Sequence, residues 1–250
     1  MTRYKVWLDQ QGLQDLDPAI CIIDLQEQPP SQLLSTAARA QGDGVFLARR
    51  ARQSLSVTVR FAIREPHPAR RQAILHKVRT WAQGSYLTTS DRPQQRLKVQ
   101  AESLPTLQSA LKWTDALSVT FTAYEAPFWE DAQPTTSAVS TLYLPGDAPA
   151  APVDVRWLCV TDAPEEVTIV TPLSHITFRS LPLHAGQELV ISHESGTLTA
   201  TIDGADVLPH RTPESSDDLL LSCGQTSAVT LTADGAAASG CIFSARGRWL

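Results

Sequence analysis

The feature that most constrains the fold of this chain is a strictly alternating segment at residues 55–64. Leu55, Val57, Val59, Phe61 and Ile63 are apolar, and the residues between them are polar or small. Because successive side chains of a strand point to opposite faces, this period of two predicts a β-strand with one buried face. Prolines at positions 66 and 68 end the pattern. The first part of the chain is therefore predicted to contain a sheet.

Further short strands are predicted on either side of this segment. They lie at residues 4–8 and 20–25, which are separated by turn residues, and at 96–101 and 116–124. A helix is predicted at about residues 68–83, with Pro68 in its first turn and Gly84 after its end. Its apolar side chains recur at steps of three and four residues and share one face, namely Ile74, Leu75, Val78, Trp81 and Ala82.

A long hairpin, or arm, is predicted at about residues 31–52. Two moderately apolar stretches flank the glycine-rich turn at 41–44, and Pro29-Pro30 is expected to close the unit before them. The flanks are too polar and basic for a core, so the arm should project and pack against something else. It carries the densest basic cluster of the chain, Arg39, Arg49, Arg50 and Arg52. These arginines suit a solvated strand face or a contact with an acidic surface on a neighbouring subunit, and nucleic-acid binding ranks third.

The sequence changes character at residues 119–130, where a strand runs into an aromatic corner. Up to Glu130 there are sixteen Lys and Arg against twelve Asp and Glu, a net charge of +4; from Asp131 onward five against fourteen give −9. We therefore predict two domains, 1–137 and 138–250, with the polar segment at 131–140 as a linker or a crossing strand. Pro127, Phe128 and Trp129 are the candidate residues of the domain junction.

The second domain is predicted to be an antiparallel sandwich of jelly-roll type that needs no helix. Turn signals such as Asp203-Gly204 and Asp234-Gly235 separate short apolar stretches. These stretches lie near residues 153–157, 167–170, 176–178, 188–191, 198–202, 219–221, 229–231 and 241–245.

Composition narrows the class of protein. An apolar fraction of 42% and a charged fraction of 19% are ordinary for a folded globular chain. The basic residues are spread along the first domain and the second domain is acidic, so specific nucleic-acid binding is not expected. No apolar run is long enough to span a membrane, and the N-terminus lacks the apolar region of a signal peptide, so synthesis and folding in the cytoplasm are expected.

The motifs that carry chemistry in other proteins are missing from this sequence. The four cysteines, Cys21, Cys159, Cys223 and Cys241, have no metal-ligand or redox spacing and are predicted to be buried thiols. Residues 193–196, His-Glu-Ser-Gly, lack the flanking glycines of a nucleophile elbow and are predicted to form a hairpin tip. Short Asp spacings at 15–17 and 203–206 fall short of a calcium loop. No catalytic residue, metal ligand or cofactor site is nominated, and the chain is predicted not to be an enzyme.

The order of these elements resembles that of the distal tail protein (Dit) of siphophages. The likeness rests on the N-terminal strand and turn, the basic arm before the alternating strand, and the single helix ending at Trp81-Ala82-Gln83-Gly84. It also rests on the corner Tyr124-Glu125-Ala126-Pro127-Phe128-Trp129-Glu130. In the second half, the hairpin at 190–207, the segment at 219–224 and the closing Arg246-Gly247-Arg248-Trp249-Leu250 look like their counterparts in the family. The Ala-rich residues 236–241 depart from its pattern.

This resemblance implies a mainly β fold with one helix. The N-terminal domain would be a ring-forming β-sandwich or split barrel with an arm hairpin. The C-terminal domain would be a galectin-like jelly-roll sandwich whose final strand could return to the first domain. The resemblance also implies a virion structural protein of a phage or prophage tail tip, assembled in the bacterial host cytoplasm. Six copies would form a ring joining the tail tube protein to the tail-associated lysin or tail-tip hub protein, through which DNA passes without being bound.

Two other functions stay open at the level of the sequence. The second sandwich could make the chain a carbohydrate-binding protein that grips host surface glycans, and a receptor-binding protein or such a glycan could also be a partner of the ring. An exposed pair of aromatic side chains would favour sugar binding, and burial of these side chains would favour the structural role. A glycan-processing enzyme would need two carboxylates facing each other in a cleft.

Overall fold

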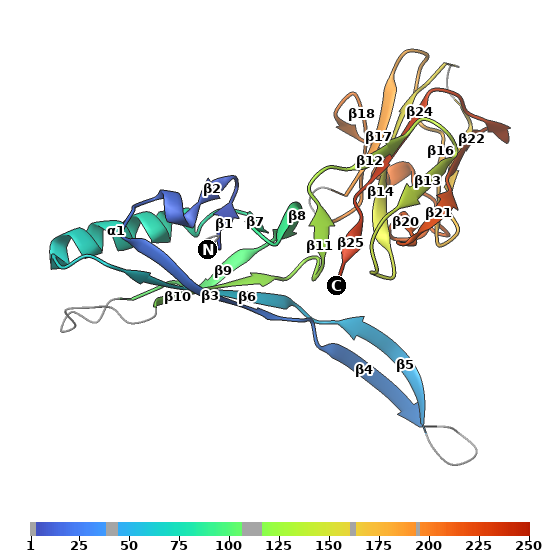
Figure 1. The fold of residues 1–250 in the computed structure, drawn as a ribbon. Helices are drawn as coiled ribbons and strands as arrows, with labels where there is room; N and C mark the ends of the chain where they lie inside the picture. The colour runs from blue at the N-terminus through green and yellow to red at the C-terminus, as the bar shows by residue number, and fades with distance from the viewer. Residues whose placement is uncertain (1–3, 39–44, 107–116, 161–163, 194–195) are drawn as a thin grey trace. The chain divides into compact units, whose positions relative to one another are not determined.

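The computed structural model describes residues 4–38, 45–106, 117–160, 164–193 and 196–250; of residues 38 and 45–51 it describes the backbone alone. The chain divides into two compact units, Met1–Trp129 and Glu130–Leu250. Both are built mainly of β-strands, and the first holds the one α-helix found among the described residues (Figure 1). The expected mainly β fold with a single α-helix is confirmed.

One sheet of the first unit has the strand order β3-β6-β10-β9. Its strands, all antiparallel to their neighbours, are β3 (Ile20–Gln28), β6 (Leu55–Ile63), β10 (Leu117–Ala123) and β9 (Gln100–Ser103). Along β6 the odd-numbered side chains are buried and the even-numbered ones are half-buried, as the alternation predicts. A bulge at Ile22/Asp24 in β3 leaves the Ile23 side chain exposed.

A second sheet of the same unit begins with the strand order β2-β1-β7-β8. These strands are β2 (Gln11–Gly12), β1 (Val6–Leu8), β7 (Tyr86–Thr89) and β8 (Arg92–Lys98), and the 3-10 turn η1 (Leu13–Asp15) follows β2. The strand predicted at 96–101 is wrong, because the chain passes between the two sheets at Val99. That side chain is buried, and its N–H donates to the carbonyl of Ser85 at 2.8 Å.

The helix α1 (Pro68–Trp81) buries the apolar face that its sequence predicts. Ile74, Leu75, Val78 and Trp81 are all buried, and Trp81 packs edge-on against Phe121 of β10 with ring centroids 5.7 Å apart. The indole N–H of Trp81 donates to the carbonyl of Gln11 at 2.8 Å. The helix is thus fixed to both sheets of its unit.

The arm leaves the first sheet between β3 and β6. Its strands β4 (Gln32–Ala38) and β5 (Val45–Arg52) form an antiparallel ribbon that runs beyond the ends of β3 and β6 (Figure 1). Pro29 and Pro30 follow the last residue of β3 and belong to no strand, so they separate β3 from the arm strand β4. The N–H of Gln53 donates to the carbonyl of Ser31 at 2.9 Å and ties the two chains together at the base of the arm.

The second unit is a sandwich of a seven-stranded and a four-stranded sheet with a two-stranded ribbon. The larger sheet has the order β12-β24-β14-β17-β18-β19, with β20 paired to β14, and the smaller sheet has the order β16-β15-β22-β23; the ribbon is β13-β21. The bounds are β12 (Thr135–Ser137), β13 (Thr141–Leu144), β14 (Ala151–Leu158), β15 (Glu166–Val170), β16 (His175–Arg179), β17 (Glu188–Ser192), β18 (Thr199–Ile202), β19 (Ala205–Asp206), β20 (Leu220–Leu221), β21 (Gln225–Ala228), β22 (Thr230–Ala233), β23 (Ala236–Ala237) and β24 (Cys241–Ala245), with a 3-10 turn η2 (Leu208–His210).

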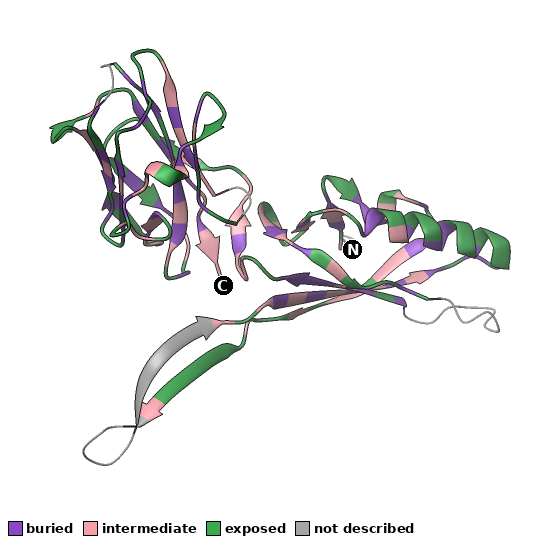
Figure 2. Ribbon diagram, turned by 180° about the vertical axis from the view of Figure 1, so that it is seen from behind, coloured by how far each residue is buried: buried purple, intermediate pink, exposed green. Residues whose placement is uncertain are grey.

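Each of the eight apolar stretches predicted in this half contains a strand. Buried residues recur along the strands of this unit in Figure 2. Their side chains form one core, which includes Trp157, Phe178 and Phe243. The polar segment at 131–140 is a crossing strand and not a free linker, because β12 within it pairs with β24. The hairpin predicted at 193–196 is confirmed by the antiparallel pairing of β17 with β18, although Glu194 and Ser195 lie outside the described residues.

The first and last strands of the second unit meet. β11 (Trp129–Asp131) enters this unit at Glu130 and β25 (Arg248–Trp249) lies at its end. The N–H of Asp131 donates to the carbonyl of Gly247 at 2.9 Å. The guanidinium of Arg248 donates two hydrogen bonds to one carboxylate oxygen of Glu130, at 2.8 and 3.0 Å. A Cβ at position 247 would lie 2.3 Å from a carboxylate oxygen of Asp131, so only glycine fits.

The cysteines are more exposed than expected. All four are free thiols, but only Cys159 and Cys241 are buried, while Cys21 and Cys223 are half-buried. Within the described part of the chain, no helix combines the length and the hydropathy needed to cross a bilayer.

Candidate functional site

The arm is the main candidate for a functional surface. Residues 32–36 of β4 are exposed, as the green part of this strand in Figure 2 shows. Leu33 and Leu34 are each 54% exposed. Adjacent residues of a strand point to opposite faces, so the two leucines present apolar surface on both sides of the ribbon. A two-stranded ribbon alone is only marginally stable in water. The arm therefore has apolar surface to bury and no place for it in its own unit.

Both ends of the arm are anchored to the aromatic corner of the first unit. On the incoming side, the carboxylate of Glu27 accepts a hydrogen bond from the indole N–H of Trp129 at 3.2 Å and lies 3.5 Å from the guanidinium of Arg92. Arg92 in turn lies over the Trp129 ring, 4.8 Å from its centroid. On the outgoing side, the guanidinium of Arg52 lies 5.6 Å from the centroid of the Phe128 ring. The direction in which the arm leaves the sheet is therefore coupled to this corner.

The predicted site residues fall partly within this arrangement. Arg39 and the side chains of Arg49 and Arg50 lie outside the described residues, so their predicted role at a subunit interface stays a prediction. Arg52 is half-buried at the base of the arm. Of the junction candidates, Trp129 is fully buried and is the last residue of the first unit, whereas Pro127 and Phe128 are half-buried.

Sequence reasoning missed several residues of this region. Leu33 and Leu34 could have been found, because two adjacent leucines in a strand cannot share one buried face. Glu27 and Arg92 gave no signal, since each stands in a polar stretch far along the chain from Trp129. Arg92 holds its place with one guanidinium nitrogen buried and without a hydrogen-bond partner in the described structure.

The open face of the β3-β6-β10-β9 sheet is a second notable surface. It carries hydroxyl pairs across the strands, Ser56 with Thr122 and Thr58 with Thr120, each 3.2 Å apart. The charged residues Asp24 and Arg60 stand opposite each other in register on this face. Thr122 is buried and donates a hydrogen bond to the carboxylate of Glu102 at 2.6 Å, so this face is polar but only partly open to solvent.

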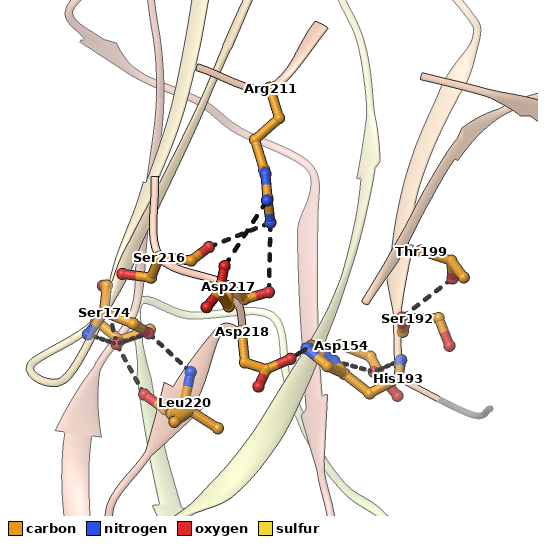
Figure 3. A network of polar contacts seen from close by, with 11 residues as sticks. Asp154, Ser174, Ser192, His193, Thr199, Arg211, Ser216, Asp217, Asp218 and Leu220 are labelled. Carbon is orange, nitrogen blue, oxygen red and sulfur yellow. Dashed lines mark hydrogen bonds and ion pairs between the residues drawn. The ribbon is translucent and has the colours of Figure 1, made fainter. Parts of the chain in front are cut away.

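A network of polar side chains in the second unit includes His193 (Figure 3). Its side chain is only 6% exposed; Nδ1 lies 3.2 Å from a carboxylate oxygen of Asp154, and Nε2 lies 4.0 Å from Asp218. A histidine that activates a nucleophile needs one ring nitrogen facing a hydroxyl or thiol. Here both nitrogens face carboxylates, so this network does not have that arrangement.

Other potential sites have little chemistry to offer. A shallow groove of about 570 Å³ lies between α1 and the β1–η1 segment, and its lining includes Asp9, Asp15, Lys77 and Trp81. The carboxylate of Asp9 is already used, since it accepts the backbone N–H groups of Ser85 and Tyr86. Among the described His, Cys, Asp and Glu side chains, no three are grouped so as to hold a metal ion.

Perturbed titrations in this chain have structural causes. Burial, with a hydrogen bond donated to Asp91, raises the pKa of Tyr4 to about 12. Partial burial acts to raise the pKa of Asp91, but hydrogen bonds from Thr89 and Tyr4 outweigh it and the pKa lies below its ordinary value. Burial raises the pKa of Cys241 to about 11 and also raises that of Cys223. Neither of these two thiols is activated for nucleophilic chemistry.

The aromatic side chains of the second unit are mostly internal. Trp157, Phe178 and Phe243 are buried, and the half-buried Trp249 donates its indole N–H to Asp131 at 2.9 Å. Tyr143 is 55% exposed. The described residues of this unit thus present no exposed pair of aromatic rings on which a sugar could stack.

Comparison with known proteins identifies the fold. No protein-family model matches the sequence, and no curated protein matches it. Among solved structures, the chain has the fold of a phage Dit protein, which confirms the resemblance expected from the sequence.

That structure is the Dit protein (gp 19.1) of phage SPP1, described as a paradigm of the hub adsorption apparatus in phages that infect Gram-positive bacteria. It is 12% identical, with a TM-score of 0.71, and the match covers 99% of both chains. Chains of the phage P2 baseplate, in its activated conformation with Ca or with Sr, are each 9% identical. They give TM-scores of 0.52 and 0.50 and cover 98% of this chain and 97% of theirs. At these identities the likeness establishes the fold.

Proposed function

We propose that this chain is a structural component of the tail tip of a long-tailed phage or prophage. In this proposal six copies form a ring that joins the tail tube to the tail-associated lysin or baseplate and to the host-recognition apparatus. The likeness to SPP1 Dit and to the P2 baseplate chains over nearly their whole length supports the structural role.

The observation that carries the proposal is the exposed arm. A closed ring needs head-to-tail interfaces, in which one surface of a subunit meets a different surface of the next. An arm with exposed leucines on both faces can supply such a surface by packing on, or adding to, a neighbour's sheet. The sheet β3-β6-β10-β9 has β3 and β9 as its edge strands, and closure of a ring would protect such edges.

The hydroxyl-rich face of the same sheet suits the inner wall of such a ring. Its hydroxyl groups carry no positive charge that would hold the phosphates of DNA passing along it. We assign ring formation to the domain at 1–137. The domain at 138–250 would be a galectin-like sandwich that points outward. The proposed partners are copies of the chain itself, the tail tube protein and the tail-associated lysin or tail-tip hub protein.

The alternative is a carbohydrate-binding protein that holds host glycans through the second sandwich. The burial of Trp157, Phe178 and Phe243 argues against this alternative, because a sugar ring stacks only on an aromatic face that is exposed. The structural role is therefore the better supported of the two.

The mass of the chain in solution tests the proposal. The wild-type chain is expected to form a ring of six copies whose population rises with protein concentration. A variant in which residues 32–52 are replaced by a short Gly-Ser linker should be monomeric, with an unchanged unfolding temperature for the rest of the chain, because Ser31 and Gln53 already meet at the base of the arm.

Native mass spectrometry and negative-stain microscopy would give the oligomeric state of the wild type and of the armless variant. A wild-type chain that stays monomeric at every concentration would contradict ring formation by the chain itself. An armless variant that assembles as well as the wild type would contradict the role given to the arm.

A further inference from the structure

A buried histidine of the second unit has an unmatched ring nitrogen. His193 follows β17 directly, and its Nε2 atom is buried with no hydrogen-bond partner in the described structure. A carboxylate oxygen of Asp218 lies 4.0 Å from this nitrogen; Figure 3 shows the two side chains facing each other. A buried polar atom without a partner is unusual, since such atoms are nearly always hydrogen-bonded.

The other ring nitrogen, Nδ1, has a hydrogen-bond partner. One carboxylate oxygen of Asp154, in β14, accepts the backbone N–H of His193 at 2.9 Å and faces Nδ1 at 3.2 Å. A carboxylate can only accept, so Nδ1 must carry a proton. In a neutral imidazole Nε2 is then bare, and it faces Asp218 as one acceptor facing another.

A second proton reverses this relation. A protonated Nε2 is a donor and Asp218 is an acceptor, so the two attract each other. The Asp218 side chain is 49% exposed and can turn toward the ring to close the gap. Asp154 would stabilise the same imidazolium from the other side.

Two cations, Arg211 and Arg156, belong to described segments near the ring. Arg211 is occupied within its own segment, where it donates to the carbonyl of Ser216 at 3.4 Å and lies 3.9 Å from the carboxylate of Asp217. Arg156 stands two positions beyond Asp154 on the same face of β14, and β18 contributes the uncharged Thr199. Carboxylates thus hold the two positions next to the ring nitrogens.

Asp218 belongs to a segment that joins the two sheets of the sandwich. We call residues 211–218 the strap. It covers the edge of β16, where the N–H groups of Thr212 and Ser216 donate to the carbonyls of Thr177 and His175 at 2.9 and 2.8 Å. Directly after it, β20 pairs with β14 of the other sheet. A bond between His193 and Asp218 would therefore fasten the strap to the sheet that contains Asp154.

We propose that His193 is a proton-operated latch of the second unit. When its ring binds a second proton, it bridges Asp154 and Asp218 and locks the strap. When that proton leaves, the strap is released on this side. The latch is independent of the oligomeric state of the chain.

Hydrogen exchange of the strap amides at pH 5.5 and 7.5, corrected for the intrinsic pH dependence of exchange, tests the latch. In the wild type, the amides of Thr212 and Ser216 should be about tenfold or more better protected at the lower pH. Asp218→Asn should lose this difference. Asp217→Asn is the matched control, because it removes the same charge from the adjacent position, and it should keep the difference.

Nitrogen chemical shifts of the His193 ring provide a second readout that needs no substitution. They should show the Nδ1–H form at pH 7.5 and the doubly protonated ring at pH 5.5. Equal protection at both pH values, equal behaviour of the two Asp variants, or an Nε2–H ring at pH 7.5 would each overturn the latch. So would protection that follows added Zn²⁺ and is removed by EDTA, since a metal ion would then be the missing partner.

Discussion

Replacing Leu33 and Leu34 by serine should weaken assembly of the chain without destabilising its subunits. Full burial of a leucine contributes about 1.5–3 kcal/mol. Because each side chain is 54% exposed, about half of that remains available to a neighbour. The pair would then supply about 1.6–3.2 kcal/mol per interface, so the double variant should lower the association constant of each interface roughly 15- to 200-fold.

The free energy of unfolding of the free subunit should stay nearly unchanged. Surface substitutions usually alter the free energy of unfolding by less than about 0.5 kcal/mol. Sedimentation velocity over a range of concentrations would give the association constant, and urea unfolding of the monomer would give its stability. Leu173→Ser is the matched control, since Leu173 is 50% exposed but lies in the second unit between β15 and β16.

Two results would refute the reasoning. If the double variant lost more than about 2 kcal/mol of monomer stability, the leucines would be packed within their own subunit. If the double variant and Leu173→Ser weakened association equally, or neither did, the arm would not be the surface that joins subunits.

Three further predictions follow from other contacts. Arg248→Gln should lower the free energy of unfolding of the second unit by about 1.5–3 kcal/mol, because the mostly buried carboxylate of Glu130 loses its charged hydrogen-bond partner. Urea unfolding measures this loss. The double variant Glu130→Gln/Arg248→Gln should lose no more stability than the single variant, because it leaves no unpaired charge. The pKa of Tyr4 lies above that of a tyrosine in the unfolded chain, so its stabilising effect should be complete below about pH 10 and disappear as the pH rises to about 12; a phenolate step near pH 12 in the ultraviolet titration should be missing from Tyr4→Phe. Cys241 should stay unreactive toward a thiol reagent at pH 8 in the folded chain and react once urea unfolds it, and reaction of the native thiol at the rate of a free cysteine would contradict its burial.

Local patterns predicted the parts of the fold that depend on local physics. The strand at 55–63 and the helix α1 could be predicted from the period of their apolar residues, because burial of one face imposes that period on the sequence. The strand β8, with the sequence RPQQRLK, was not fully readable. Its polar side chains are matched by partners from distant segments, such as Glu27 for Arg92 and Glu125 for Lys98.

The candidate site was predictable in outline and not in its contacts. The basic arm and the aromatic corner stood out by composition. The bond between Trp129 and Glu27 joins residues 102 positions apart, and the unmatched nitrogen of His193 depends on Asp154 and Asp218 from two other segments. Such pairs arise only when the chain folds, and no spacing in the sequence marks them.

Because β11 lies beside β25, the first and last residues of the second unit are adjacent in space. Glu130 and Arg248, 118 positions apart, are bonded there directly. A domain whose two ends are adjacent can be replaced by another domain, or circularly permuted, without distorting the domain before it in the chain. A chain of this fold can therefore exchange its second unit for another module with equally close ends, while the arm-bearing unit stays unchanged.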